Sequence, residues 1–320
     1  MLDHGIARML QAMHDDGEPP LFVDHDATLA RRRGVEIRGR YYPPVRLDVA
    51  TVEETAIPGP AGPRRARIYR PPAPTGATVV FFHGGGWIIG DLDSHDGHAR
   101  RLAATVGAVV VHVEYRLAPE NPFPAAYLDC VAAVEWAGEH IDELGGRPEL
   151  LAVAGDSAGG NLAAAAALHC RDIGLPLAAQ LLIYPAVDLT SLMPAKDELD
   201  DDDFFTGQDD WVERQYLAGD LRQARDSRVS PLFADSHAGL APAVIGIGHH
   251  DPLLPQNLAY ADALRAAGVP VVLREYPDLV HGFFGMGAIS ARAEHAADQL
   301  CRDLAATLRL GAGRLTGAAR

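Results

Sequence analysis

Ser157 is the residue best placed for nucleophilic chemistry. It lies in the stretch LLAVAGDSAGGNLAA at residues 150–164, where a short apolar run ends at Gly155 and an alanine-rich helical pattern starts at about Gly160. Gly155 and Gly159 flank the serine in the spacing G-x-S-x-G, and residues without Cβ let a chain turn sharply from strand to helix and lift the hydroxyl above a sheet. Because many such matches are plain turns, the nucleophile hypothesis needs partner residues elsewhere.

Asp251 and His281 are the residues that could complete a hydrolytic site with Ser157. An apolar run at residues 243–248 precedes Asp251, and another at 271–276 precedes His281. Both side chains are therefore expected at the C-terminal ends of strands, the sheet edge where ligands bind in open α/β sheets. The chain order serine, acid, histidine is the one expected of an α/β-hydrolase triad.

Asp278 is a second acid near His281, but the local sequence favours Asp251 as the triad acid. Asp278 follows Pro277 in a connection predicted to be a turn, where aspartate commonly hydrogen-bonds its own backbone. Asp251 ends a buried strand and precedes Pro252, which restricts it to an extended backbone. A triad acid has to be held rigidly, because it fixes the orientation of the imidazole.

The sequence HGGGW at residues 83–87 follows an apolar run, TVVFF, at residues 78–82. Three consecutive glycines are costly in backbone entropy, so they indicate a close approach of the backbone to another group. The backbone N–H groups of Gly85 and Gly86, with that of Ala158, are candidates for an oxyanion hole. The alternative is a flexible glycine turn, and the tryptophan that ends the sequence could equally line an acyl pocket or pack in the core.

Two groups of residues contain metal-binding side chains but are expected to hold no metal. His95 and His98 are three residues apart and near acids, but no third ligand cluster is visible in the sequence, which favours a structural role. The acidic run at residues 197–203 lacks the D-x-D-x-D-G pattern of a calcium loop, which favours a solvated face.

The remaining pattern predicts an α/β core with a cap in two parts. Residues 1–45 show helical spacing, a break at the two prolines 19 and 20, and a second helical stretch through Leu29, so they are expected to form N-terminal cap helices. Strands alternate with helices in residues 46–184 and 232–320, which predicts a mostly parallel sheet preceded by a hairpin of strands at 46–52 and 66–69. Residues 185–231 break the alternation and are expected to form the second part of the cap.

Composition excludes several other classes of function. The formal net charge of −15, with basic residues in no stripe, argues against binding to nucleic acid or to anionic membranes. Three widely spaced cysteines, Cys130, Cys170 and Cys301, are expected to be buried free thiols. The N-terminal residues lack the apolar core of a signal peptide, and no apolar run is long enough to span a membrane, so we expect a soluble cytoplasmic protein.

These motifs together resemble the hormone-sensitive lipase-like esterases, the bacterial group of the α/β-hydrolase superfamily whose nucleophile motif reads GDSAGG. The resemblance rests on five segments in order, namely HGGGW at 83–87, YRLAPE at 115–120, GDSAGG at 155–160, DPL at 251–253 and HGF at 281–283. It implies an eight-stranded sheet, a helical cap, and hydrolysis of carboxylic esters without a cofactor. The sequence departs from the family pattern at Pro255, where the family usually has a further aspartate. This change affects the residues expected to support the acid loop, but Asp251 itself is present.

The expected activity is hydrolysis of short- to medium-chain esters by an acyl-enzyme mechanism. The expected partner is a small-molecule ester, and a homodimer is possible. Amide hydrolysis or deacetylation of an acylated metabolite is an alternative that the same triad permits. A second alternative is a ligand-binding receptor on this fold, because some plant hormone receptors resemble the family but have lost the histidine. His281 is present here.

Overall fold

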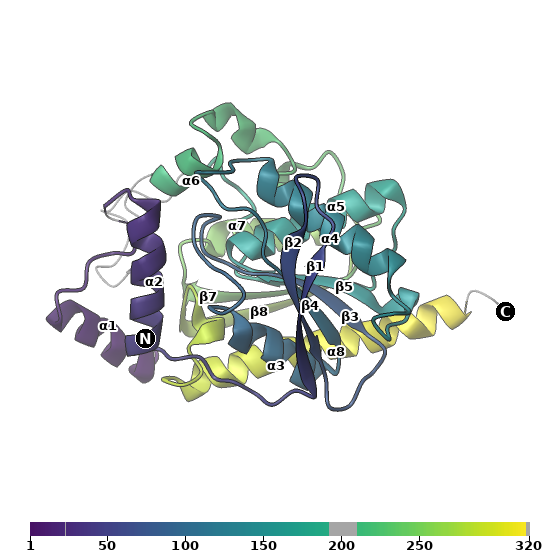
Figure 1. Ribbon diagram of the computed structural model, residues 1–320, viewed down its shortest axis with the longest axis horizontal. Helices are drawn as coiled ribbons and strands as arrows, with labels where there is room; N and C mark the ends of the chain where they lie inside the picture. The colour runs from purple at the N-terminus through teal and green to yellow at the C-terminus, as the bar shows by residue number, and fades with distance from the viewer. Residues whose placement is uncertain (23, 192–209, 318–320) are drawn as a thin grey trace.

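A single eight-stranded sheet forms the centre of the molecule in the computed structural model, which describes residues 1–22, 24–191 and 210–317 (Figure 1). The strand order is β1-β2-β4-β3-β5-β6-β7-β8, and pairing is antiparallel for β1–β2 and β2–β4 and parallel elsewhere. This confirms the predicted mostly parallel sheet with a hairpin at one edge. The strands are β1 (Thr51–Ile57), β2 (Arg64–Arg70), β3 (Thr78–Phe82), β4 (Val109–Val113), β5 (Leu151–Asp156), β6 (Ala179–Ile183), β7 (Ala243–His250) and β8 (Val271–Val280).

Helices cover both faces of the sheet. Those on one face pack in one apolar cluster with the sheet, and those on the other face pack in a second cluster (Figure 1). The first set is α4 (Ala125–Glu139), α5 (Ala158–Ile173) and α7 (Leu254–Ala266), and the second is α3 (Asp96–Val106) and α8 (Ala291–Gly317). The other helices are α1 (His4–Asp15), α2 (Ala27–Tyr41) and α6 (Trp211–Tyr216), with short 3₁₀ turns η1 (Pro148–Leu150), η3 (Leu221–Arg225), η4 (Pro231–Phe233) and η5 (Phe283–Gly285).

The central strands are apolar because both of their faces are covered. Every residue of β3, β4, β5 and β6 is buried, as expected for parallel strands between two layers of helices. β1 is different, because most of its residues are exposed and it is held by its pairing with β2. The predicted strand at residues 46–52 is therefore misplaced, since the observed strand starts at Thr51 and runs to Ile57.

Two further elements differ from the sequence prediction. The second N-terminal helix was expected to end near Leu29, but α2 begins at Ala27, where Asp26 accepts a hydrogen bond from the N–H of Leu29 at 3.0 Å, and continues to Tyr41. The predicted turn around Asp278 is wrong, because β8 continues through this residue to Val280. The acidic run at 197–203 lies outside the described residues.

The connection between α1 and α2 contacts α6 above the carboxyl edge of the sheet. Phe22 lies 6.0 Å from the Trp211 ring, and His25 stacks on the same ring at 5.6 Å. Residues 1–45 and the described part of 185–231 thus touch each other (Figure 1).

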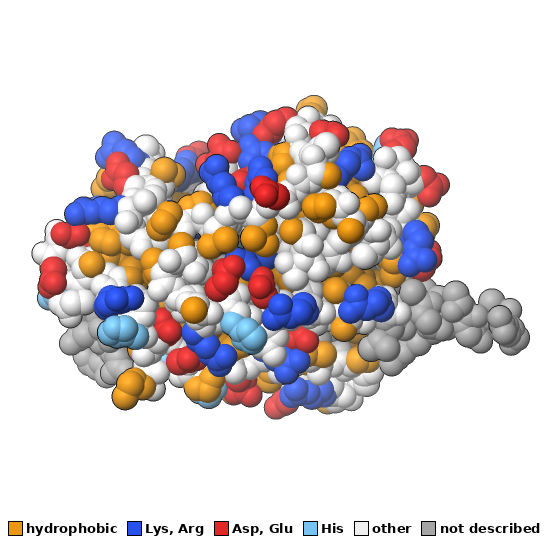
Figure 2. Space-filling view, turned by 90° about the horizontal axis from the view of Figure 1, so that it is seen from below, with side chains coloured by type: hydrophobic (Ala, Val, Ile, Leu, Met, Phe, Trp, Pro, Cys, Tyr) orange, Lys and Arg blue, Asp and Glu red, His pale blue; other side chains and the backbone are white. Residues whose placement is uncertain are grey.

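Charges of both signs lie on the face of the molecule shown in Figure 2. On the face shown in Figure 2, basic and acidic side chains are interspersed with apolar ones. Among the described residues, no helix combines the length and apolarity needed to cross a membrane. The three cysteines are buried free thiols, as predicted.

Candidate active site

Ser157 stands on a sharp turn between β5 and α5. Its backbone has φ of 55° and ψ of −119°, a conformation that L-residues rarely adopt and that tertiary contacts have to impose. The turn is tight enough to exclude side chains around it: a Cβ on Gly159 would lie 2.0 Å from the carbonyl oxygen of Phe82. The glycine spacing noted in the sequence therefore reflects a close approach of α5 to β3.

His281 links Ser157 to Asp251 through its two ring nitrogens. Nε2 lies 2.9 Å from Ser157 Oγ, and Nδ1 lies 2.8 Å from Asp251 Oδ2. With the ring proton on Nδ1, His281 donates to Asp251 and accepts from the serine hydroxyl, which is the arrangement a general base requires. Asp251 is buried, and its other oxygen accepts a hydrogen bond from the N–H of Leu253 at 2.8 Å.

The structure separates Asp278 from this chain of hydrogen bonds. Both of its carboxylate oxygens lie 3.1 Å from Nε of Arg292, and its backbone oxygen accepts from the N–H of Asp3. Pro255 lies in the first turn of α7, where proline costs no hydrogen bond, so the departure from the family pattern leaves the support of Asp251 intact.

The glycine loop brings backbone donors to the same point. Gly85 and Gly86 have φ of 121° and 59°, the region that favours glycine. Within the described residues, the N–H groups of Gly85, Gly86 and Ala158 donate to no acceptor, and all three residues line the cavity that contains Ser157. Unsatisfied N–H groups around a nucleophile are what an oxyanion would need.

Buried polar groups hold the glycine loop in place. The N–H of Gly84 donates to Asp156 Oδ1 at 3.0 Å, and the hydroxyl of Tyr115 donates to the carbonyl oxygen of His83 at 2.6 Å. The His83 and Tyr115 rings stack at 4.3 Å, and burial lowers the pKa of His83, so its ring is neutral. Asp156 and Tyr115 lie inside motifs visible in the sequence, GDSAGG and YRLAPE, although their supporting roles were not predicted.

A cavity of about 880 Å³ opens above Ser157 and His281. Residues of α2 and α6 supply part of its wall, and the sheet edge supplies the floor. Trp87 lines the cavity and is also core, because it is 3% exposed and stacks on Tyr216 at 4.3 Å. Tyr184, which the sequence did not single out, also lines the cavity, and its ring centroid lies 4.7 Å from that of His281.

His95 and His98 also line the cavity, and the structure brings a third potential ligand to them. The Nε2 atom of His95 lies 3.5 Å from Asp156 Oδ2, and one ring nitrogen of each histidine and one oxygen of Asp156 lie within 4.8 Å of one another. The expectation that no third ligand joins the two histidines is wrong, because Asp156 reaches them from β5 across the fold. Burial lowers the pKa values of His95 and His98 well below the usual range.

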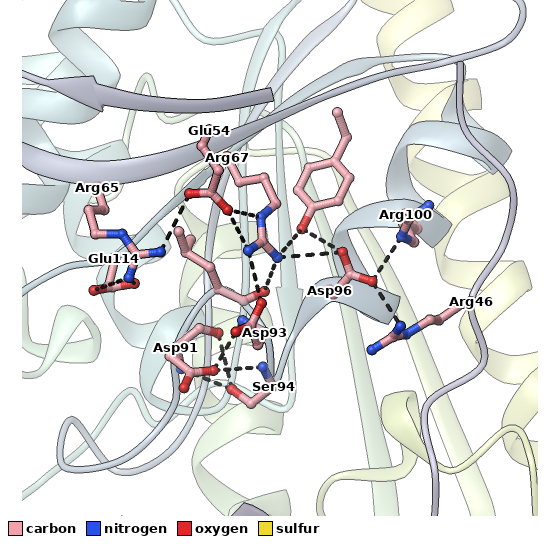
Figure 3. A network of polar contacts seen from close by, with 12 residues as sticks. Arg46, Glu54, Arg65, Arg67, Asp91, Asp93, Ser94, Asp96, Arg100 and Glu114 are labelled. Atoms are coloured by element: carbon pink, nitrogen blue, oxygen red, sulfur yellow. Dashed lines mark hydrogen bonds and ion pairs between the residues drawn. The ribbon is translucent and has the colours of Figure 1, made fainter. Parts of the chain in front are cut away.

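A network around Arg67 holds the start of α3, where His95 is the N-cap and His98 lies in the first turn (Figure 3). Arg67 projects from β2 and contacts Glu54, Asp93 and Asp96, with Nη2 at 2.8 Å from Asp93 and Nε at 2.7 Å from Glu54. Asp96 also accepts from the hydroxyl of Tyr69 at 2.9 Å. The hairpin at the sheet edge, in which the sequence showed no chemistry, thus fixes the start of α3.

Comparison with known protein families gives one match over most of the core. Residues 79–285 match a family described as having the alpha/beta hydrolase fold. This range contains Ser157, Asp251 and His281.

Named relatives extend the similarity to nearly the whole chain. The carboxylic ester hydrolase LipN of Mycobacterium tuberculosis is 40% identical over 317 residues, covering 96% of this chain and 83% of that protein. The carboxylesterase NlhH of the same species is 40% identical over 284 residues, with 83% and 84% covered.

Solved structures of esterases and related hydrolases also resemble this chain. A hyperthermophilic esterase from the archaeon Pyrobaculum calidifontis aligns with a TM-score of 0.84 at 35% identity, covering 95% of this chain and 98% of that chain. An alpha/beta hydrolase enzyme from the metagenome of Lake Arreo aligns with a TM-score of 0.88 at 33% identity, with 96% and 98% covered.

Proposed function

The chain belongs to the α/β-hydrolase fold family, and we propose that this carboxylic ester hydrolase cleaves short- to medium-chain esters through an acyl-enzyme on Ser157. The observation that carries the proposal is the hydrogen-bonded chain from Asp251 through His281 to Ser157 at the floor of the cavity. The GDSAGG and HGGGW motifs support an assignment to the hormone-sensitive lipase-like group. We also propose the division of the chain that the sequence predicts, with a core of residues 46–184 and 232–320 and a cap of residues 1–45 and 185–231.

In the proposed mechanism, His281 takes the hydroxyl proton of Ser157 as Oγ attacks the ester carbonyl carbon. Asp251 orients the imidazole and stabilises its cationic form. The carbonyl oxygen becomes an oxyanion that accepts hydrogen bonds from the N–H groups of Gly85, Gly86 and Ala158. When the ester C–O bond breaks, the leaving alcohol takes the proton from His281.

Deacylation repeats these steps with water as the nucleophile. His281 removes a proton from a water molecule, the resulting hydroxide attacks the acyl carbon, and the acid leaves as Ser157 regains its proton. Protein groups and water supply every proton transfer in this sequence.

Replacement of the nucleophile tests the proposal. Ser157→Ala should lower turnover of a soluble p-nitrophenyl ester by about six orders of magnitude, the usual cost of deleting a triad nucleophile. The variant should still melt cooperatively, and a fluorophosphonate probe should label the wild-type chain but not the variant. More than a percent of wild-type activity in a pure preparation would place the nucleophile elsewhere.

The cavity supports a limit on acyl size. A volume of about 880 Å³ enclosed partly by the cap suits a small ester better than a lipid surface. We expect soluble butyrate and hexanoate esters to be hydrolysed faster than emulsified long-chain triglycerides. The same screen should include matched amides, because faster amide cleavage would favour the amidase alternative.

Location and assembly remain predictions. The three buried free thiols are compatible with a reducing cytoplasm. β8 is an edge strand of the sheet, and edge strands can pair with a second copy, so sedimentation analysis is the check for a homodimer.

A further inference from the structure

Two imidazoles and a carboxylate meet in the cavity wall, beside the proposed nucleophile. His95, His98 and Asp156 are 4%, 5% and 5% exposed, and all three line the cavity. We propose that these three side chains form a reversible binding site for a divalent transition-metal ion of the zinc type. The proposal for metal binding does not depend on the proposed esterase mechanism.

The distances are close to those that zinc requires. Zinc binds imidazole nitrogen and carboxylate oxygen at about 2.0–2.2 Å in tetrahedral sites, which puts neighbouring ligand atoms roughly 3.4 Å apart. The atoms of His95 and Asp156 already lie 3.5 Å apart, and the widest separation in the group is within 4.8 Å. A side-chain adjustment of His98 of little more than an ångström would complete a three-ligand site with its fourth position open to the cavity.

Supporting contacts orient two of the ligands. The Nδ1 atom of His95 lies 3.0 Å from Ser94 Oγ, which leaves Nε2 facing Asp156. Asp156 uses Oδ1 to accept from Gly84, so Oδ2 is the oxygen that faces His95. Such second contacts fix the ring orientation and the ligand atom in metal sites. The Arg67 network of Figure 3 holds the loop from which His95 projects.

His98 distinguishes a metal site from a structural hydrogen bond. A weak hydrogen bond between His95 and Asp156 would account for those two residues alone. His98, however, has no hydrogen-bond partner for its ring nitrogens among the described residues, although the ring is buried and contacts Phe81 and Phe284. Because His98 lines the cavity and its nitrogen lies within 4.8 Å of the other two ligand atoms, its imidazole is available to bind a metal ion with them.

Charge makes the site reversible rather than permanent. Asp156 supplies one negative charge, whereas Arg38 lies within electrostatic reach of His98 and opposes a cation. The ion would also draw charge from the carboxylate that holds Gly84, next to the oxyanion loop. If the proposed esterase mechanism holds, bound zinc should therefore slow ester hydrolysis, and removal by a chelator should restore it.

Calorimetric titration with Zn²⁺ tests the site in the full-length chain. The wild type should bind one ion more tightly than any surface site. His98→Phe, which keeps a ring against Phe81 and Phe284, should weaken this binding by more than the roughly tenfold to hundredfold that loss of a supporting contact costs. The matched control is His169→Gln, because His169 pairs with Glu135 at 2.6 Å near the surface and should not affect the tight site.

Co²⁺ gives a second readout that does not depend on variants. Tetrahedral coordination by the proposed ligands should produce strong visible absorption in the wild type, and Zn²⁺ should displace it. If His98→Phe does not melt cooperatively, His95→Gln replaces it as the variant in the same titration. The proposal is overturned if the wild type binds no ion. It is also overturned if His98→Phe and His95→Gln bind the ion as tightly as the wild type. That result would place the ion at another site, for example on His281 and Asp251. Metal binding is measured directly and not through activity. The result of the Ser157→Ala test of the proposed function therefore does not change the result of the metal titration.

Discussion

Ser157 occupies a backbone conformation that costs about 1–3 kcal/mol for a residue with a side chain. The cost is offset by contacts on both sides of the turn, since the N–H of Ser157 donates to Ile183 and its carbonyl oxygen accepts from Asn161. Asn161 in turn donates to the carbonyl oxygens of Ala186 and Val229. The strained serine is therefore held by neighbours from several elements, and the same contacts keep its hydroxyl 2.9 Å from His281.

Asp251 and Asp278 provide a matched pair for testing the acid of the site. Asp251→Asn should lower turnover by about three to four orders of magnitude, because an amide in this position favours the wrong tautomer of His281. Asp278→Asn removes only an ion pair with Arg292 and should cost less than about tenfold, or 1.4 kcal/mol of barrier. Both variants should be assayed with one soluble ester after their melting curves are compared. A severe loss in Asp278→Asn beside normal activity in Asp251→Asn would reverse the assignment.

The sequence was informative for residues that belong to short motifs and uninformative for contacts between them. Ser157, Asp251 and His281 could be proposed because each follows an apolar run that ends at the same sheet edge. The meeting of Asp156 with His95 and His98 could not, because it depends on how α3 packs against the end of β5. For Asp278, proline and aspartate suggested a turn, but β8 continues across an irregularity in the register, because Tyr276 and Val280 on either side both pair with β7.

Among the elements, helix α2 packs on the core through buried apolar residues such as Ile37, and Arg31 adds polar contacts to the same core. Arg31 donates to both oxygens of Glu120, at 2.8 and 2.6 Å, and also to the carbonyl oxygens of Ile88 and Ala118. Ile88 directly follows the HGGGW sequence, and Ala118 and Glu120 lie within the YRLAPE motif. The arginine therefore ties the cap to the part of the core that carries the proposed oxyanion hole.

Glu120→Gln should loosen the attachment of α2, because it removes the charge that Arg31 binds. The hydrogen bond from Arg31 lowers the pKa of Glu120 from 4.5 to about 2, so the carboxylate stabilises the fold above its ordinary pKa. This contribution is lost as the pH falls through the folded value. We expect the difference in melting temperature between wild type and variant to be largest near neutral pH and to narrow below about pH 4.5. Glu149→Gln, which alters an ion pair far from the cap, is the control.

Element boundaries show why propensity alone was insufficient. α2 carries many arginines and buries few side chains, Ala27, Ala30 and Ile37 among them, so its apolar pattern is too sparse to show its full length. β1 is mostly exposed, and its position is set by register with β2, in which Thr51 pairs with Arg70. The apolar runs at residues 78–82 and 243–248 lie within two residues of the bounds of β3 and β7, because burial on both faces makes such a run apolar.

At the scale of the molecule, the sheet joins two cores that contain one or more buried thiols each. Cys130 and Cys170 belong to the cluster with α4, α5 and α7, whereas Cys301 belongs to the cluster with α8 on the other face (Figure 1). Together the three thiols therefore report on the packing of both faces of the sheet.

Thiol reactivity provides a test of whether the two cores unfold together. Burial raises the pKa of Cys170 and of Cys301 to about 12, and that of Cys130 well above its usual value, so the folded chain should resist Ellman's reagent at about pH 8. When the chain is unfolded with increasing denaturant, all three thiols should become reactive in one transition, and this transition should coincide with the loss of the helical circular dichroism signal. Because the folded state disfavours the thiolates, their contribution to stability is complete below the unfolded pKa of about 8.5 and declines as the pH rises towards 12. Reaction of Cys301 at a lower denaturant concentration than the other two would show that the α8 face opens independently.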